Sequence, residues 1–197
     1  MDMFEAVENA LKGFQRREMV AGTLVRSAVL VPLFRKDDEL HVLLCRRTDF
    51  VLTHKRQISF PGGAVDPGDS DEVATALREA WEEVGLAPQD VRVLGLLSDT
   101  ETITGFRITP VVGIIPFPHP FQPSPREVEE LLLVPFQVFS HPTGHRRESF
   151  EHDGRTYETD FYRHQDHVIW GATARIAREL VELMAGGSLP LPSRSGT

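Results

Sequence analysis

The chain has 197 residues, 41% of them hydrophobic, which is enough for one substantial core, so we predict a single domain over residues 1–197. It carries 29 acidic residues against 21 basic ones, and the formal net charge of -8 disfavours nonspecific binding to nucleic acid or to an anionic membrane surface. No apolar run approaches the roughly 18 residues of a membrane span, and the N-terminus does not read as a signal peptide. We therefore expect neither a nucleic-acid partner nor a membrane partner.

The only cysteine, Cys45, lies in the apolar run HVLLC, so an intramolecular disulfide is impossible and a buried thiol is expected. A free thiol suits a reducing compartment, and no targeting sequence is found. The sequence therefore predicts a cytoplasmic protein.

The first elements in chain order are a helix and a hairpin. Apolar residues recur at helical spacing over residues 3–17, which predicts a peripheral N-terminal helix within residues 1–20. Two β-rich runs, 27–34 and 40–46, are separated by a short polar segment and predict a hairpin. Residues 48–59 predict a loop that enters a short strand.

A predicted helix that ends at Gly85 follows a glycine turn, and its buried side is expected to comprise Ala76, Leu77, Ala80, Trp81 and Val84. Strands are predicted at 91–97 and 107–115, a proline-rich surface loop at 116–125, and a strand or short helix at 127–139. Asp153-Gly154 predicts a hairpin between 146–152 and 155–162. A strand at 168–170, a helix at 173–184 and a frayed tail at 188–197 complete the chain.

Three glutamates on the central helix are the most informative feature. Glu79, Glu82 and Glu83 are spaced so that all three share one helical face, where like charges repel. The alternative, a solvated surface of an ordinary helix, leaves unexplained the adjacent Gly62-Gly63 turn, whose backbone could approach a ligand. The pattern therefore indicates a site for a hard divalent cation.

These residues resemble the signature of the Nudix hydrolases. Arg78, Glu79, Glu82, Glu83, Gly85 and Leu86 match its Arg-Glu-x-x-Glu-Glu-x-Gly core, and the spacing from Gly63 to Asp69 is the usual one. The interval from Asp69 to Arg78 is one residue longer than in the common signature. This longer form, with FPGG and TALREAWEEVGL, resembles the coenzyme A pyrophosphatase branch.

The resemblance continues upstream of the FPGG turn. Arg47, Thr48 and His54 occupy the places of an Arg, a Ser or Thr, and a His that are typical of this branch. Arg56 stands where the branch pattern has glycine, which leaves the shape of the substrate loop open. Downstream, residues 104–116 and 168–182 are also similar to the branch.

The resemblance implies a fold of the α/β (α+β) class, a Nudix-type α/β/α sandwich with a mixed β-sheet between helices. It implies Mg²⁺ or Mn²⁺ held by Glu79, Glu82 and Glu83 with a backbone carbonyl from Gly62, while Arg78 orients Glu79 or its neighbours by a bidentate salt bridge. The implied reaction is cleavage of coenzyme A, or an acyl or oxidised form, to 3′,5′-ADP and 4′-phosphopantetheine.

The group that takes the proton from water differs among Nudix enzymes. We assign this role to Glu79, with Glu101, Glu127 and Glu130 as later candidates that are more often ordinary surface acids. For substrate phosphates, the basic residues just before the turn are the candidates: Arg46, Arg47, His54, Lys55 and Arg56. The alternative is that some of these side chains only face water. Phe106, Phe117 and Phe121 could line a substrate pocket, although core packing is the commoner role.

Two other functions remain open at this point. One is a Nudix hydrolase of another nucleoside diphosphate derivative, such as ADP-ribose or NADH, or of a nucleoside triphosphate. The other is a nucleotide-binding module without catalysis, against which the complete glutamate set argues. A homodimer is also possible, with the N-terminal helix or the 141–165 hairpin as its interface, and the sequence does not choose between them.

Overall fold

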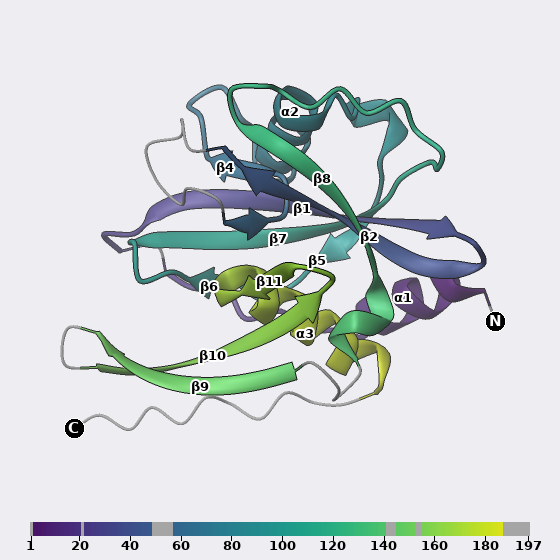
Figure 1. Cartoon of the computed structure of the whole chain (residues 1–197). Helices are drawn as coiled ribbons and strands as arrows, with labels where there is room; N and C mark the ends of the chain where they lie inside the picture. The colour runs from purple at the N-terminus through teal and green to yellow at the C-terminus, as the bar shows by residue number, and fades with distance from the viewer. Residues whose placement is uncertain (1, 21, 49–56, 141–144, 153–154, 187–197) are drawn as a thin grey trace.

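The computed structural model describes residues 2–20, 22–48, 57–140, 145–152 and 155–186. Its elements form a large mixed sheet covered by helices on both faces, with a smaller sheet beside it (Figure 1). The α/β/α architecture predicted from the sequence is therefore confirmed.

Five strands form the main path of the large sheet, in the order β3 (Ile58–Ser59), β2 (Glu39–Arg47), β1 (Val25–Lys36), β7 (Phe106–Ile114) and β5 (Arg92–Leu96). Three further strands pair with members of this path: β4 (Gly62–Ala64) with β1, β6 (Thr100–Glu101) with β7, and β8 (Val128–Pro135) with β2. The β1–β7 pair is parallel and the other pairs are antiparallel, so the sheet is mixed.

Each face of the large sheet has its own helical cover. Helix α2 (Glu72–Val84) packs on one face, and α1 (Met3–Lys12) and α3 (Gly171–Met184) pack on the other. The alternation of side chains along β1 explains this, because Ala28 and Leu30 join the core under α2 while Val31 and Leu33 join the core under α1 and α3.

The smaller sheet has the order β11 (His167–Trp170), β10 (Arg155–His164) and β9 (His145–His152). The antiparallel register between β9 and β10 confirms the predicted hairpin, although Asp153 and Gly154 lie outside the described residues. Tyr162 and Ile169 belong to the same buried cluster as α3. A core shared by both sheets supports the single domain, which stays a prediction.

The structure corrects two expectations about helices. Helix α1 ends at Lys12 and not near residue 17, because Gly13 follows as its C-cap. Trp81 was predicted to be buried, but it is 54% exposed, so the apolar stripe of α2 is narrower than predicted. In the described parts of the chain, no helix is long and apolar enough to cross a membrane.

Short elements were missed or left undecided by the sequence. Strands β4 and β6 have three and two residues, too few for a periodic signal. For residues 127–139 the sequence predicts either a strand or a short helix. The structure contains both, because β8 is followed by the 3-10 helix η2 (Phe136–Phe139). A second 3-10 helix, η1 (Pro88–Asp90), links α2 to β5.

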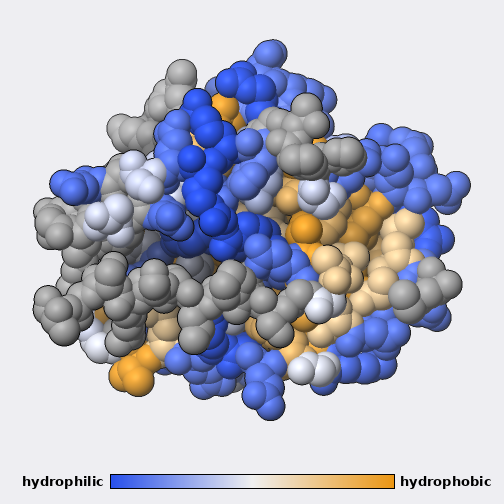
Figure 2. Space-filling model, turned by 90° about the horizontal axis from the view of Figure 1, so that it is seen from below, coloured by the Kyte–Doolittle hydropathy of each residue, from blue (hydrophilic) through white to orange (hydrophobic). Residues whose placement is uncertain are grey.

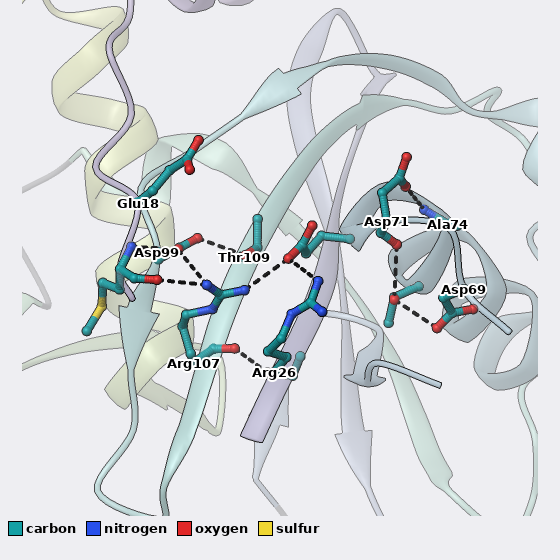
Figure 3. A network of polar contacts seen from close by, with 12 residues as sticks. Glu18, Arg26, Asp69, Asp71, Ala74, Asp99, Arg107 and Thr109 are labelled. Carbon is teal, nitrogen blue, oxygen red and sulfur yellow. Dashed lines mark hydrogen bonds and ion pairs between the residues drawn. The ribbon is translucent and has the colours of Figure 1, made fainter. Parts of the chain in front are cut away.

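A network of ion pairs fixes the start of α2 on the sheet (Figure 3). Arg26 of β1 and Arg107 of β7 lie opposite each other in the parallel register, and Glu72 Oε1 accepts hydrogen bonds from both, at 2.8 and 2.9 Å. Arg107 also donates to the carbonyl of Met19 at 2.7 Å. Asp71 caps the helix by accepting from the Ala74 N–H at 2.8 Å. The first turn of α2 is therefore tied to two central strands.

Replacement of Glu72 tests this network. Glu72→Ala leaves two adjacent arginines without their shared anion, so we expect the free energy of unfolding to fall by about 2 kcal/mol. Urea denaturation measures the change. Glu18→Ala is the matched control, because Glu18 is in an exposed ion pair with Arg16 and should change stability by less than about 0.5 kcal/mol. Equal losses in both variants would contradict the assigned role of Glu72.

Candidate active site

The sequence predicts a turn at Gly62 and Gly63, but both residues belong to strand β4, which pairs with β1 and brings its backbone directly against the glutamates of α2. A Cβ atom on Gly63 would lie 2.4 Å from Oε1 of Glu79, and one on Gly62 would lie 2.4 Å from the carbonyl oxygen of Ala28. A side chain at Gly62 would clash with the backbone of β1, and one at Gly63 would displace the Glu79 carboxylate. The absence of side chains there lets the Glu79 carboxylate rest on strand β4.

Glu83 is the most deeply buried carboxylate of the site, with 1% of its surface exposed. Its Oε1 accepts a hydrogen bond from Nη1 of Arg47 at 3.0 Å, and its Oε2 accepts one from the N–H of Gly62 at 3.2 Å. Burial raises the pKa of Glu83 from its ordinary 4.5 to about 7, against the opposing effect of Arg47. This carboxylate is held in place at a cost in solvation that a cation would offset.

Glu79 has a similar but milder environment. Burial raises its pKa, the Arg78 guanidinium opposes this, and the charges of Glu82 and Glu127 add to the rise. A carboxylate whose pKa is raised in this way holds a proton more readily at neutral pH.

Arg78 contacts the acidic residues of the site, but its bidentate ion pair is not with Glu79 or a neighbouring glutamate, as was predicted. Its two-pronged ion pair is with Asp69, at 2.9 Å for both Nε–Oδ1 and Nη2–Oδ2, and it lowers the pKa of that carboxyl. Its Nη1 makes single contacts with Glu79 at 2.8 Å and Glu82 at 3.1 Å. No role was predicted for Asp69, whose only sequence signal was its usual distance from Gly63.

The carboxylates of the site are of the kind that binds a hard divalent cation, but their side chains are not grouped as ligands around a single ion. In the part of the chain that the structure describes, no three His, Cys, Asp or Glu side chains are grouped so as to hold an ion. The Glu82 side chain is 52% exposed, whereas that of Glu83 is 2% exposed. Carboxylate oxygens are the ligands that Mg²⁺ and Mn²⁺ prefer. Glu79 and Glu83 would hold the ion, with Glu82 at the rim.

The second half of the proline-rich loop, and the residues just after it, close on the end of α2. The N–H groups of Gln122 and Ser124 donate to the carbonyls of Val84 and Glu83 at 2.9 and 2.8 Å. The carbonyl of Glu127 accepts from the N–H of Thr48 at 2.9 Å. These bonds place Glu127 where its charge raises the pKa of both Glu79 and Glu83.

The other two later candidates lie in different surroundings. Glu130 forms an ion pair with Arg46 at 3.4 Å and its Oε1 lies 3.6 Å from Nε2 of His167, while Glu101 is an exposed residue of β6. Glu127 is therefore the later candidate with an electrostatic contact to the glutamates of α2.

The structure brings only part of the predicted basic group to the site. Arg47 reaches Glu83, but Arg46 is ion-paired with Glu129 at 3.1 Å and with Glu130. His54, Lys55 and Arg56 lie outside the described residues, so their roles stay predictions.

The phenylalanines considered for a substrate pocket are largely structural. Phe117 and Phe121 pack against the core under α2, and the ring of Phe117 stacks on Phe34 with centroids 4.7 Å apart. Phe106, which begins β7, is half-buried.

Comparisons with known proteins agree with this geometry. A family model described as NUDIX domain matches residues 24–154. Nudix hydrolase NudL from Enterobacter sp. (strain 638) is 39% identical over 160 residues, covering 79% of this chain and 80% of that relative. NudL from Escherichia coli (strain K12) is 37% identical over 155 residues, with the same shares covered.

Solved structures show the same fold. The Nudix hydrolase RenU from M. smegmatis has a TM-score of 0.55 at 23% identity and covers 92% of each chain. A MutT/nudix family protein from Enterococcus faecalis has a TM-score of 0.52 at 14% identity, covering 94% of this chain and 70% of that one. The family model spans most of the chain, and the NudL relatives align with it over a still larger share. The chain therefore belongs to the Nudix hydrolase family.

Proposed function

We propose that this Nudix protein hydrolyses the pyrophosphate linkage of coenzyme A, or of an acyl or oxidised form of it, with Mg²⁺ or Mn²⁺ as cofactor. The observation that carries the reaction class is the buried Glu83 and the half-buried Glu79 beside Gly62 and Gly63 of strand β4. The choice of coenzyme A is supported by the sequence signature around Arg47 and the FPGG turn.

In this reaction a water oxygen bonds to phosphorus while the bond from phosphorus to the bridging oxygen breaks. The products from coenzyme A are 3′,5′-ADP and 4′-phosphopantetheine. A bound divalent ion would offset the charge on the phosphate oxygens and lower the pKa of the attacking water. Glu79 would accept the water proton, and its carboxylate is held in position by Nη1 of Arg78 at 2.8 Å.

Two arginines of the site, Arg78 and Arg47, contribute by where they hold charged groups. Arg78 holds Glu79 and Glu82 while its fork is anchored on Asp69 and its Nη2 on the carbonyl of Ala64. Arg47 is oriented by Glu83, which places a guanidinium next to the carboxylates, where it can bind a substrate phosphate.

The alternatives to coenzyme A keep the same chemistry. Another nucleoside diphosphate derivative would be hydrolysed by the same site. The basic residues 54–56, which would distinguish one substrate from another, lie outside the described residues. A nucleotide-binding module without catalysis is disfavoured because Glu79, Glu82 and Glu83 are all present. We also propose that the chain forms a homodimer.

A product-resolved assay tests the substrate. With Mg²⁺ or Mn²⁺, coenzyme A should yield 3′,5′-ADP and 4′-phosphopantetheine in equal amounts, as separated by chromatography and identified by mass. ADP-ribose, NADH and a nucleoside triphosphate are run in parallel. Failure to release 3′,5′-ADP with either metal would refute the coenzyme A proposal, while turnover of another substrate would retain the hydrolase.

Substitution of the carboxylates tests the assignment of the base. Glu79→Gln keeps the shape of the side chain but cannot accept a proton, so kcat should fall by about 10²- to 10⁴-fold with little change in KM. Glu127→Gln should have a smaller effect, and Glu130→Gln, outside the site, should have almost none. Turnover that survives Glu79→Gln but not Glu127→Gln would transfer the role to Glu127.

The stability of the metal-free protein should depend on the charge of Glu83. Because folding raises its pKa from 4.5 to about 7, the folded state keeps a proton that the unfolded chain releases. The stabilisation is complete below pH 4.5 and is lost as the pH rises through about 7, a change of about 3 kcal/mol. Urea denaturation in EDTA should show this decline, and Glu83→Gln should reduce it by that amount. Parallel curves for the two proteins would contradict the raised pKa.

A further inference from the structure

Thr48 follows directly on the last residue of β2 and is buried, with 6% of its surface exposed. Its hydroxyl donates a hydrogen bond to the carbonyl oxygen of Arg126 at 2.7 Å, and its N–H donates one to the carbonyl oxygen of Glu127 at 2.9 Å. Arg126 lies 78 positions further along the chain, in the segment that leads into β8. Thr48 therefore holds two consecutive peptide groups of a distant segment against the end of β2.

The same segment is also attached to the last turn of α2. The N–H of Glu127 donates to the carbonyl of Ser124 at 3.0 Å, and the N–H of Ser124 donates to the carbonyl of Glu83 at 2.8 Å. Arg47, the neighbour of Thr48, returns to the Glu83 carboxylate through its Nη1 at 3.0 Å. These contacts form a closed ring that begins and ends at Glu83, and Thr48 is the member that joins β2 to Glu127.

The pairing of β2 with β8 is irregular just before Thr48. The register between the two strands shifts between Arg46 and Arg47, a shift typical of a β-bulge. Arg46, before the shift, is ion-paired with acidic residues of β8, whereas Arg47 contacts Glu83 of α2. The two hydrogen bonds of Thr48 therefore hold the segments together at the point where the regular ladder ends.

The side chain of Glu127 acts electrostatically on the glutamates of α2. Its charge contributes to the raised pKa of both Glu79 and Glu83, although burial is the larger cause for each. Coulombic interactions weaken with distance, so this effect depends on where the Glu127 backbone is held. The same negative charge would attract a divalent cation bound by these glutamates. The attachment of Glu127 to β2 therefore bears on the cation site.

We propose that Thr48 is a positioning residue of this enzyme. Its hydroxyl holds the Arg126–Glu127 backbone on the end of β2 and thereby keeps the Glu127 carboxylate close to the glutamates of α2. Thr48 acts through Glu127 and has no chemical step of its own. This inference rests on the proposed function, because the position of Glu127 matters for a hydrolase that binds a divalent cation at α2.

Three substitutions separate the hydroxyl of Thr48 from its bulk. Thr48→Val removes the hydroxyl and keeps the shape, whereas Thr48→Ser keeps the hydroxyl and removes a methyl group. Thr173→Val is the matched control, because Thr173 is 7% exposed and its hydroxyl donates to the carbonyl of Ile58 at 3.0 Å. Thr173 belongs to α3, which lies below the large sheet in Figure 1, on the side that Figure 2 views, whereas α2 lies on the opposite side.

The first measurement is the affinity for Mn²⁺ without substrate, read from the electron paramagnetic resonance signal of the free ion. Thr48→Val should weaken binding about tenfold, as should Glu127→Gln, because both remove the Glu127 charge from its place. Thr48→Ser and Thr173→Val should stay within about twofold of the wild type. Urea denaturation of the same proteins reports the loss of stability, which a purely structural role of Thr48 would make the only effect.

The second measurement is turnover of whichever substrate the product-resolved assay identifies. Thr48→Val should lower kcat about tenfold, and Thr48→Ser should restore it to within about twofold of the wild type. In a protein that already carries Glu127→Gln, adding Thr48→Val should change kcat little, because the two substitutions act through one group. Multiplication of the two effects would contradict this route.

The outcomes for Thr48 and for the proposed function are distinct. A wild type that binds Mn²⁺ but hydrolyses no substrate refutes the function, and the Mn²⁺ affinities then decide the role of Thr48. Wild-type affinity in Thr48→Val, or an equal loss in Thr48→Ser or Thr173→Val, would overturn the proposal, as would a wild type that binds no Mn²⁺. Thr48→Ala replaces Thr48→Val if the latter does not fold. Failure of both to fold would make Thr48 a residue of stability alone.

Discussion

The buried carboxylate of Glu83 is the constraint on which the site depends. Its two oxygens accept hydrogen bonds from Arg47 at the end of β2 and from the N–H of Gly62 in β4, so one side chain joins the helix, strand β4 and a candidate phosphate contact. Burial of this acid is unfavourable in isolation, and the raised pKa expresses that cost. A cation or a proton is needed to balance it, which links the stability of the fold to the function.

The rest of the scaffold keeps α2 in place around this carboxylate. Glu72 is held between Arg26 and Arg107 at the first turn, and the N–H groups of Gln122 and Ser124 satisfy carbonyls at the last turn. Both ends of the helix are therefore tied to segments distant in sequence. The second of these attachments also brings Glu127 to the site, so the proline-rich loop has a functional consequence although it contains no regular structure.

The sequence was sufficient for features that rest on local patterns. The β-rich runs 27–34 and 40–46, the hairpin predicted on either side of Asp153-Gly154, and the helix predicted to carry the Arg-Glu-x-x-Glu-Glu motif each correspond to elements of the structure. The sequence could not show that Arg78 forms an ion pair with Asp69, or that Arg46 forms ion pairs with acidic residues of β8. Both pairings join residues that lie nine or more positions apart in the chain. Helical spacing placed three glutamates on one face, but it could not tell the buried Glu83 from the exposed Glu82.

The central claim is that Glu79 and Glu83 bind a divalent cation beside Gly62 and Gly63 of strand β4. The most direct measurement is a crystal structure of the protein with Mn²⁺, in which anomalous scattering locates the ion without assumptions about the substrate. We expect a manganese peak between these two carboxylates, with the Glu83 side chain still in contact with Arg47. Manganese bound elsewhere, with Glu79 and Glu83 still paired only with arginine and backbone, would contradict this account.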